Sequence, residues 1–200
     1  MKKLVAALMF LFATAVWAGD FEDGSAAYKK GDFKTAVRLF QKVAIKGYSS
    51  AQYNLALMYK KGEGVVQDYA EAVRWFKLSA AQGDSEAQIN LALMYQKGEG
   101  VVQDYAEAAR WFKLSAAQGN SSAQINLAVR YYYGEGVLQD YLQAHMWMNL
   151  AAVSGDKDAQ KIRDAIATKM TSQQIGKAQT MAQKCLASKY KDCEWRHISS

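Results

Sequence analysis

Three short loops repeat the residues Gly-Glu-Gly, a composition that invites comparison with phosphate-binding loops. They lie at residues 62–64, 98–100 and 134–136. Glycine-rich loops cradle phosphate groups with their backbone amides, but the known fingerprints need either a third glycine or a Gly-Lys-Ser/Thr ending. Neither is present here. We therefore interpret these loops as turns and expect no cofactor.

The acidic and histidine side chains form no recognisable catalytic pattern. Glu63, Glu99 and Glu135 recur once per loop, which is typical of a solvated surface and not of an acid/base pair. His145 and His197 are the two histidines, and no His-x-x-x-His or Cys/His cluster accompanies them, so we expect no metal site. The chain also lacks a Gly-x-Ser-x-Gly motif. The sequence therefore predicts no catalytic residue.

Cys185 and Cys193 lie eight residues apart. In an oxidising compartment a disulfide is the first interpretation, with two free thiols as the alternative. On one unbroken helix the two Cα atoms would stand about 12 Å apart, whereas a disulfide needs them within about 7 Å. If they pair, the helix that begins near Thr171, with Gln174 as its capping partner, must break around residues 188–191. We then expect a cap on the end of the fold and not a redox site.

The first residues indicate the compartment. Lys2 and Lys3 precede an almost wholly apolar stretch, and residues 16–18 resemble a signal-peptidase site. The stretch is shorter than the roughly 20 residues of a membrane-spanning helix. We expect a signal peptide at residues 1–18 and a mature chain that is exported, periplasmic or secreted, without a transmembrane segment.

The charge of the mature chain is mildly positive. Cleavage after residue 18 removes two lysines and no acid, so the formal net charge falls from +6 to +4 (6 − 2). Acidic and basic residues are interspersed, and nucleic-acid binding requires a denser positive face. We expect no nucleic-acid partner.

The strongest signal is an internal repeat of 36 residues. Gly47, Gly83, Gly119 and Gly155 stand 36 residues apart. Residues 47–82 and 83–118 differ at only five positions, 48, 50, 53, 60 and 73. Repeats of this length are supersecondary units that cannot bury their apolar faces alone, so neighbouring copies must stack.

Each repeat is predicted to hold two helices. Asp68 caps the second helix, with Glu71 as the reciprocal partner of a capping box, and Gly83 ends it. The recurring tryptophans, Trp75, Trp111 and Trp147, are expected in the core. Apolar residues at the helical period are Ala51, Leu55, Met58 and Tyr59 in the first helix, and Tyr69, Ala72, Val73, Phe76 and Ala80 in the second.

The pattern A-x-x-x-L-A-x-x-Y-x-x-G-x-G-V-x-x-D-x-x-x-A-x-x-W-x-x-x-(S/A)-A-x-x-G over residues 51–83 resembles the Sel-1-like repeat. It recurs at 87–119 and 123–155. This resemblance implies an all-α fold, a right-handed α-solenoid of antiparallel helix pairs related to tetratricopeptide repeats. It also implies an exported scaffold or adaptor that binds a protein or peptide partner without catalysis.

Together with the first residues, the resemblance predicts how the chain divides into segments. We expect a signal peptide at 1–18, a tetratricopeptide-like hairpin at 19–46, three full repeats at 47–154, and a divergent capping repeat and tail at 155–200. Cysteine-rich relatives associated with β-lactam binding or hydrolysis carry a cysteine pair in every repeat. This chain has one pair and so departs from that pattern; a β-lactam-binding or β-lactamase-like enzyme is kept as the alternative that the resemblance implies. A structural subunit of an envelope or polysaccharide-export assembly is a third possibility.

A partner is expected on the face formed by the first helices, which line the concave side in solenoids of this kind. A turn of 100° per residue places three of the five variable positions on one outward strip. Exposed apolar rows are often interaction surfaces, although neighbouring helices can also cover them. The predicted partner-binding residues are Tyr53, Leu57, Lys60, Ile89, Leu93, Gln96, Ile125, Val129 and Tyr132, flanked by Asn54, Asn90 and Asn126.

Overall fold

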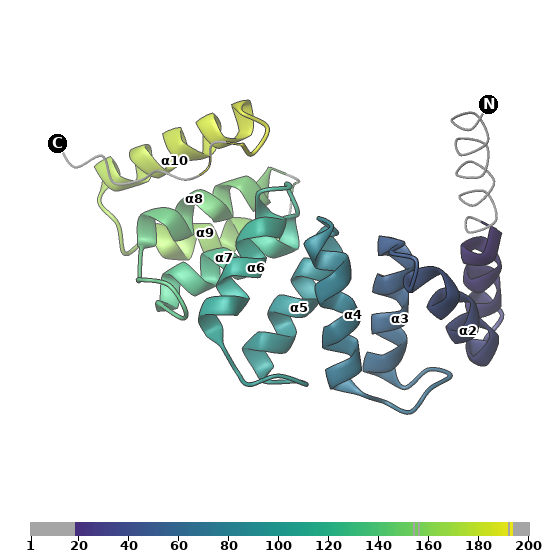
Figure 1. The fold of residues 1–200 in the computed structure, drawn as a ribbon. Coiled ribbons are helices and arrows are strands. Elements are labelled where there is room, and N and C mark those ends of the chain that lie inside the picture. Colours follow the sequence, from purple (N-terminus) through teal and green to yellow (C-terminus); the bar gives the residue numbers. More distant parts are fainter. Residues whose placement is uncertain (1–18, 154, 156, 192, 194–200) are drawn as a thin grey trace, which may run out of the picture. The chain divides into compact units, whose positions relative to one another are not determined.

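A computed structural model describes residues 19–153, 155, 157–191 and 193. These residues form helices joined by short loops, with no strand among them, so the predicted all-α fold is confirmed (Figure 1). None of the described helices is both long and apolar enough to cross a membrane. The predicted signal peptide, residues 1–18, lies outside the described residues.

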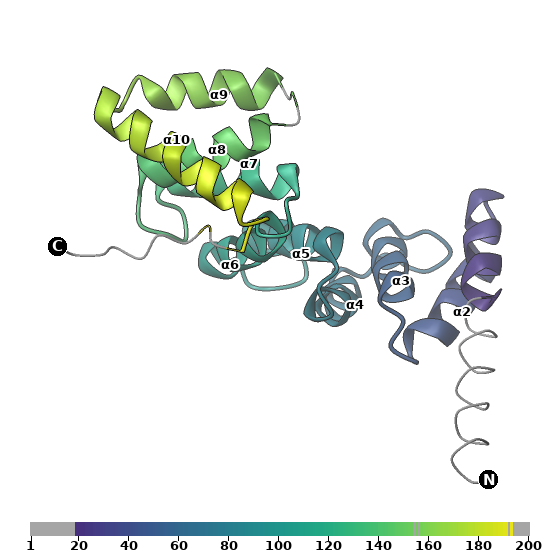
Figure 2. The ribbon, with the colours of Figure 1, turned by 90° about the horizontal axis from the view of Figure 1, so that it is seen from above.

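The chain divides into two compact units, residues up to 87 with 99–101, and residues 88–98 with those from 102 onward. In the first unit, a helical segment at residues 19–29 precedes α2 (Phe33–Ala44), α3 (Ser49–Lys61) and α4 (Tyr69–Ala81). α3 packs against both α2 and α4. Figures 1 and 2 show α3 and α4 side by side, as the antiparallel pair that the repeat predicts.

α5 (Ser85–Lys97) begins at the boundary between the units and lies mostly in the second. The other helices of the second unit are α6 (Tyr105–Ala116), α7 (Ser121–Tyr133), α8 (Tyr141–Ala152), α9 (Lys157–Ala167) and α10 (Ser172–Ala187). α8 packs against α7, α9 and α10. It is therefore the most deeply buried helix described, with Trp147, Met146 and Met148 at its centre.

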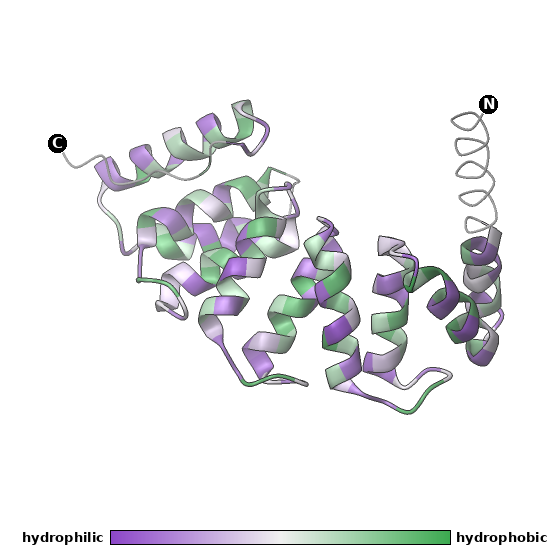
Figure 3. Cartoon of the chain, in the orientation of Figure 1, coloured by the Kyte–Doolittle hydropathy of each residue, from purple (hydrophilic) through white to green (hydrophobic). Residues whose placement is uncertain are grey.

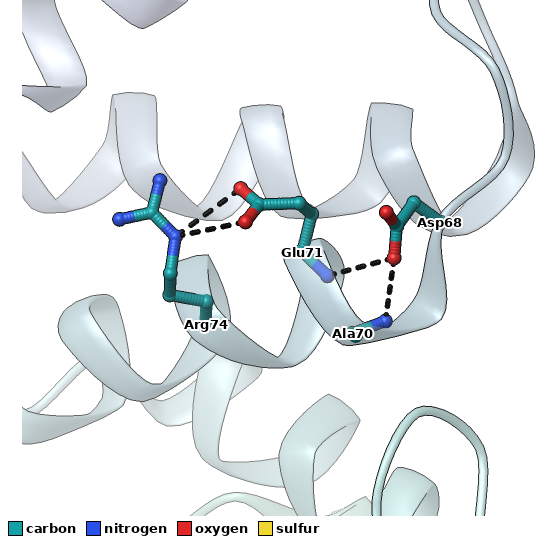
Figure 4. Close-up of polar contacts among 4 residues, drawn as sticks. All are labelled: Asp68, Ala70, Glu71 and Arg74. Carbon is teal, nitrogen blue, oxygen red and sulfur yellow. Dashed lines mark hydrogen bonds and ion pairs between the residues drawn. The ribbon is translucent and has the colours of Figure 1, made fainter.

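The capping box predicted at the start of α4 is only partly present. The Asp68 carboxylate accepts hydrogen bonds from the amides of Ala70 (2.9 Å) and Glu71 (3.0 Å), which confirms the N-cap (Figure 4). The reciprocal role predicted for Glu71 is wrong. Its carboxylate accepts from Nε of Arg74 at 3.1 and 3.2 Å, because a cation three residues on competes for it.

The core confirms most of the predicted apolar stripe. Ala72, Val73, Phe76 and Ala80 are all buried, and Trp75 and Trp111 join them. Tyr69 is an exception: it is 37% exposed, because it is the first residue of α4 and its hydroxyl accepts from Gln67. Hydrophobic and hydrophilic residues alternate along the helices of both units (Figure 3), as expected of helices that bury one face.

The second glycine of each Gly-Glu-Gly loop lies against the backbone of the preceding helix pair. Gly64 has φ 74°, and a Cβ added to it would stand 2.5 Å from the carbonyl of Phe33, at the start of α2. A Cβ on Gly100 or Gly136 would likewise overlap the carbonyl of Tyr69 or Tyr105, the first residues of α4 and α6. These loops are therefore turns, and they need glycine because another backbone lies against them.

Buried amide side chains link the helices within and between neighbouring repeats. Gln52 is 3% exposed and donates to the carbonyl of Ala44 at 3.0 Å, while its own oxygen accepts from Gln82 at 2.7 Å. Gln118 donates to Gln88 in the same way, at 2.9 Å. Each amide gains a partner for a polar group that stacking removes from water.

The C-terminal region closes the second unit as a cap. Thr171 and Gln174 form the predicted capping box at the start of α10. α10 ends at Ala187, so the helix breaks where the cysteine spacing requires it. The predicted disulfide is present, with the Cα atoms of Cys185 and Cys193 4.6 Å apart.

Candidate partner-binding face

In the first unit, the predicted partner-binding residues all lie on α3. Tyr53, Asn54, Leu57 and Lys60 are each partly buried. The ring of Tyr53 packs against Phe76 of α4, with ring centroids 5.9 Å apart, so it is held by its own helix pair.

Two of these α3 residues line a hollow of about 220 Å³ between α3 and the preceding helices. Asn54 and Leu57 form one wall. The other lining residues are Ser25, Tyr28, Lys29 and Phe40. The hollow is mixed in character, because a lysine, two hydroxyl groups and the Asn54 amide line it together with the apolar Phe40 and Leu57.

In the second unit, the predicted residues lie on α5 and α7, and one of them is not exposed. Ile89 is only 7% exposed, so neighbouring side chains cover it and the expectation of an open apolar row fails there. Asn126 donates its side-chain amide to the carbonyl of Ser122 at 2.9 Å, a bond within its own helix. The remaining predicted residues of this unit, all half-buried, are Asn90, Leu93, Gln96, Ile125, Val129 and Tyr132.

A largely apolar hollow joins α7 to α8 and α9. It has a volume of about 350 Å³, and Val129 and Tyr132 belong to it as predicted. The sequence analysis missed its other lining residues, which are Tyr133, Met148, Ile162, Ala165 and Ile166. We call this group of seven residues the α7–α9 hollow.

An aromatic cluster forms the rim of the α7–α9 hollow. The rings of Tyr132 and Tyr133 meet edge to face with centroids 4.9 Å apart, and Tyr132 also contacts Tyr141 at 5.4 Å. Tyr133 is 64% exposed, although most of its ring is apolar. One sequence signal points to it: Tyr133 stands where the two preceding repeats have Lys61 and Lys97.

Among the described residues, no charged side chain lines the α7–α9 hollow. Arg130, beside Val129 in the sequence, turns instead into the core: it is 6% exposed and pairs with Glu135. On α9, Lys161 pairs with Asp158 at 3.1 Å. An occupant of this hollow would therefore be held by apolar and aromatic contact, with the tyrosine hydroxyls as polar partners.

The loop carboxylates act as links between helices, contrary to the expectation of simple solvation. Glu63 accepts a hydrogen bond of 2.7 Å from the hydroxyl of Tyr28, in the helix before α2, and Lys61 lies 3.7 Å away. Glu135 neutralises the buried Arg130. Both carboxylates therefore take part in contacts that hold the fold together.

His145 is buried within the second unit. It is 2% exposed, and its Nδ1 lies 2.9 Å from the amide nitrogen of Asn149, one turn further along α8. Burial lowers the pKa of His145, the nearby Arg163 lowers it further, and Asp164 opposes them. The described residues contain no group of three or more His, Cys, Asp or Glu side chains able to hold a metal ion.

Comparison with known proteins identifies the repeat. The profile described as "Sel1 repeat" matches residues 18–48, 49–84, 85–120 and 121–156. A Sel1 repeat protein from Oxalobacter formigenes has a similar crystal structure, with a TM-score of 0.68 and 25% identity, covering 82% of this chain and 75% of that one. The protective antigen c5321 of uropathogenic Escherichia coli, described as having an SLR fold, gives a TM-score of 0.61 and 26% identity. That match covers 92% of this chain and 50% of the antigen.

Among curated proteins, a short segment resembles the rat and mouse DAP3-binding cell death enhancer 1. Identity is 44% over 45 residues, which is 22% of this chain. The aligned segment spans only 9% of each mammalian protein.

Proposed function

This chain belongs to the Sel1 repeat family, and on that premise we propose that it is an exported scaffold whose first helices bind a protein or peptide partner. The α7–α9 hollow is the anchor site in the second unit. Repeat arrays of stacked helix pairs offer extended faces that suit such binding. Export is proposed from the apolar, lysine-led first residues alone.

The observation that carries this proposal is the composition of the α7–α9 hollow. Its volume of about 350 Å³ accommodates one or two large side chains, and the described residues that line it are uncharged. Tyr133 is exposed beside it. Tyrosine is enriched among the residues that dominate binding energy at protein interfaces, because its ring is apolar and its hydroxyl is polar.

The test is capture of a partner from an envelope extract by chemical crosslinking, followed by mass spectrometry. Two variants alter the exposed parts of the hollow, Tyr133→Ser and Ile162→Ser, at side chains that are 64% and 37% exposed. Truncating a side chain on which an interface depends typically costs about 2 kcal/mol or more, so we expect each variant to bind the identified partner about thirtyfold more weakly.

Leu138→Ser is the matched control, since Leu138 is 91% exposed and lies outside the hollow. It should bind as the parent chain does. All three variants must keep the parent circular dichroism spectrum. Unchanged affinity in both hollow variants, with folding intact, would disprove this site. Analysis of the exported chain for an N-terminus after Ala18 tests the export proposal separately.

A further inference from the structure

The disulfide at the end of α10 encloses a loop with an unusual backbone. Lys189 and Tyr190 have φ of 54° and 64°, and they are the non-glycine residues with positive φ among those described. Two successive side-chain-bearing residues in the left-handed region cost conformational energy, and such a turn persists only where its surroundings hold it. The Tyr190 amide donates to the carbonyl of Cys185 at 2.9 Å, which folds the loop back on the helix end.

The turn directs the ring of Tyr190 onto Gly119, in the loop between α6 and α7. A Cβ added to Gly119 would stand 2.8 Å from Cε2 of Tyr190. The equivalent glycines Gly47, Gly83 and Gly155 would meet no described atom within 4 Å. Gly119, at the start of the third full repeat, therefore does more than end a helix as the equivalent glycines do: an aromatic ring packs against it.

We propose that this end of the chain is more than the static cap expected from the cysteine spacing: Cys185, Lys189, Tyr190 and Cys193 form a redox-dependent clasp. The disulfide holds Tyr190 against Gly119 and so fastens α10 to the start of the third full repeat. Cys185 lies on the same buried face of α10 as Ala178, Met181 and Ala182. The clasp thus joins α10, which packs on α8, to the loop between α6 and α7. This inference does not depend on which partner the chain binds.

The chemistry of the clasp is thiol–disulfide exchange. Closure takes two electrons and two protons from the thiols of Cys185 and Cys193 and passes them to a disulfide oxidant, which becomes a dithiol. A dithiol reductant reverses the step and is itself oxidised to a disulfide. With the bond open, nothing covalent maintains the two left-handed residues, and we expect Tyr190 to leave Gly119.

Hydrogen–deuterium exchange of the whole chain tests the clasp, with and without dithiothreitol. Closing a loop of this length restricts the open state, so reduction should raise the exchange rate of α10 amides about tenfold to a hundredfold. Peptides from α3 and α4 should be unaffected. Tyr190→Ala should raise α10 exchange in the oxidised chain and have no further effect in the reduced chain.

Glycine variants supply the matched control. Gly119→Ala and Gly83→Ala place a Cβ at similar φ, 85° and 93°, but only the first displaces Tyr190. Gly119→Ala should raise α10 exchange as Tyr190→Ala does, and Gly83→Ala should leave it unchanged. The clasp is refuted if reduction leaves α10 exchange unchanged or raises exchange in α3 and α4 equally. An equal effect of Tyr190→Ala in both redox states would also refute it.

Discussion

Replacing Arg130 by methionine should leave the stability of the second unit unchanged or raise it, whereas Glu135→Gln should lower it. Arg130 stands where the two preceding repeats have Met58 and Met94, and both methionines are 0% exposed. The guanidinium is 6% exposed, with its centre 5.8 Å from the Tyr105 ring and Glu135 as its ion-pair partner. Its Nε is buried without a hydrogen-bond partner.

The two substitutions should affect stability differently, because Glu135→Gln leaves the buried Arg130 charge without a partner, whereas Arg130→Met leaves the partly exposed Glu135 charge. Removing one partner of a buried ion pair costs about 3–5 kcal/mol, since the other charge stays buried and uncompensated. The Glu135 side chain is 40% exposed, so water already screens part of the pair, and we lower the expected loss to about 2 kcal/mol. Arg130→Met instead leaves Glu135 in contact with water and buries an apolar chain. Its effect should stay within about 1 kcal/mol of the parent.

Thermal unfolding followed by far-ultraviolet circular dichroism measures both changes. For a chain of this size, about 2 kcal/mol corresponds to a fall in Tm of about 4–8 °C for Glu135→Gln. Glu107→Gln is the control because it breaks an Arg–Glu pair, Arg110 with Glu107, whose side chains are 50% and 35% exposed. Exposed pairs contribute about 0.5 kcal/mol, so Tm should move by no more than about 2 °C.

The reasoning fails if Arg130→Met lowers Tm as much as Glu135→Gln does. That result would mean that the charge on Arg130 stabilises the fold through contacts other than Glu135. An unchanged Tm for Glu135→Gln would contradict it too, because the guanidinium would then need no counter-ion.

Three further changes test the packing and the titration. Trp111→Ala should cost about 3–5 kcal/mol, seen as a lower urea midpoint, because the side chain is buried; an unchanged midpoint would place the indole in solvent. Gly136→Ala should lower Tm more than Gly83→Ala does, because the Cβ added at residue 136 would overlap the Tyr105 carbonyl, whereas the one at residue 83 would meet no described atom within 4 Å. An equal fall in Tm for the two variants would contradict the stacking role of Gly136. Burial lowers the pKa of His145 in the folded chain. As pH falls below about 6.5, the unfolded chain therefore binds a proton at this histidine more readily than the folded chain does, and the free energy of unfolding decreases. His145→Gln should flatten that decline between about pH 7.5 and 5.5 in a series of Tm measurements, and an unaltered slope would show that another group causes it.

The predicted partner-binding residues show where helix-wheel reasoning stops. Ile89 and Ile125 occupy the same position in successive repeats, yet Ile89 is buried and Ile125 is half-buried. The wheel gives the direction of a side chain from its own helix axis, and this direction is the same for both. What lies in that direction depends on neighbouring side chains, and the near-identity of the repeats does not extend to those neighbours.

The candidate site was predictable on α7 and not on α9. Val129 and Tyr132 follow from the repeat period, and both line the α7–α9 hollow. Ile162 and Ile166 come from the divergent capping repeat at 155–200, which lacks the repeat pattern that assigns a face. Their part in the hollow appears only when α9 is packed beside α8.

The sequence by itself determined the helix pairs and most of their ends, and it required a helix break before the second cysteine if the two cysteines pair. These features depend on contacts within about four residues or on a repeated period, and both are written along the chain. Only the tertiary structure decided why Gly136 must be glycine, why Arg130 is tolerated in the core, and where Tyr190 lies. Each of these depends on a group brought from another helix or loop: the carbonyl of Tyr105, the ring of the same residue, and the bare backbone of Gly119. The spacing of residues along the chain does not predict such contacts, because the residues that make them meet only when the helices pack together.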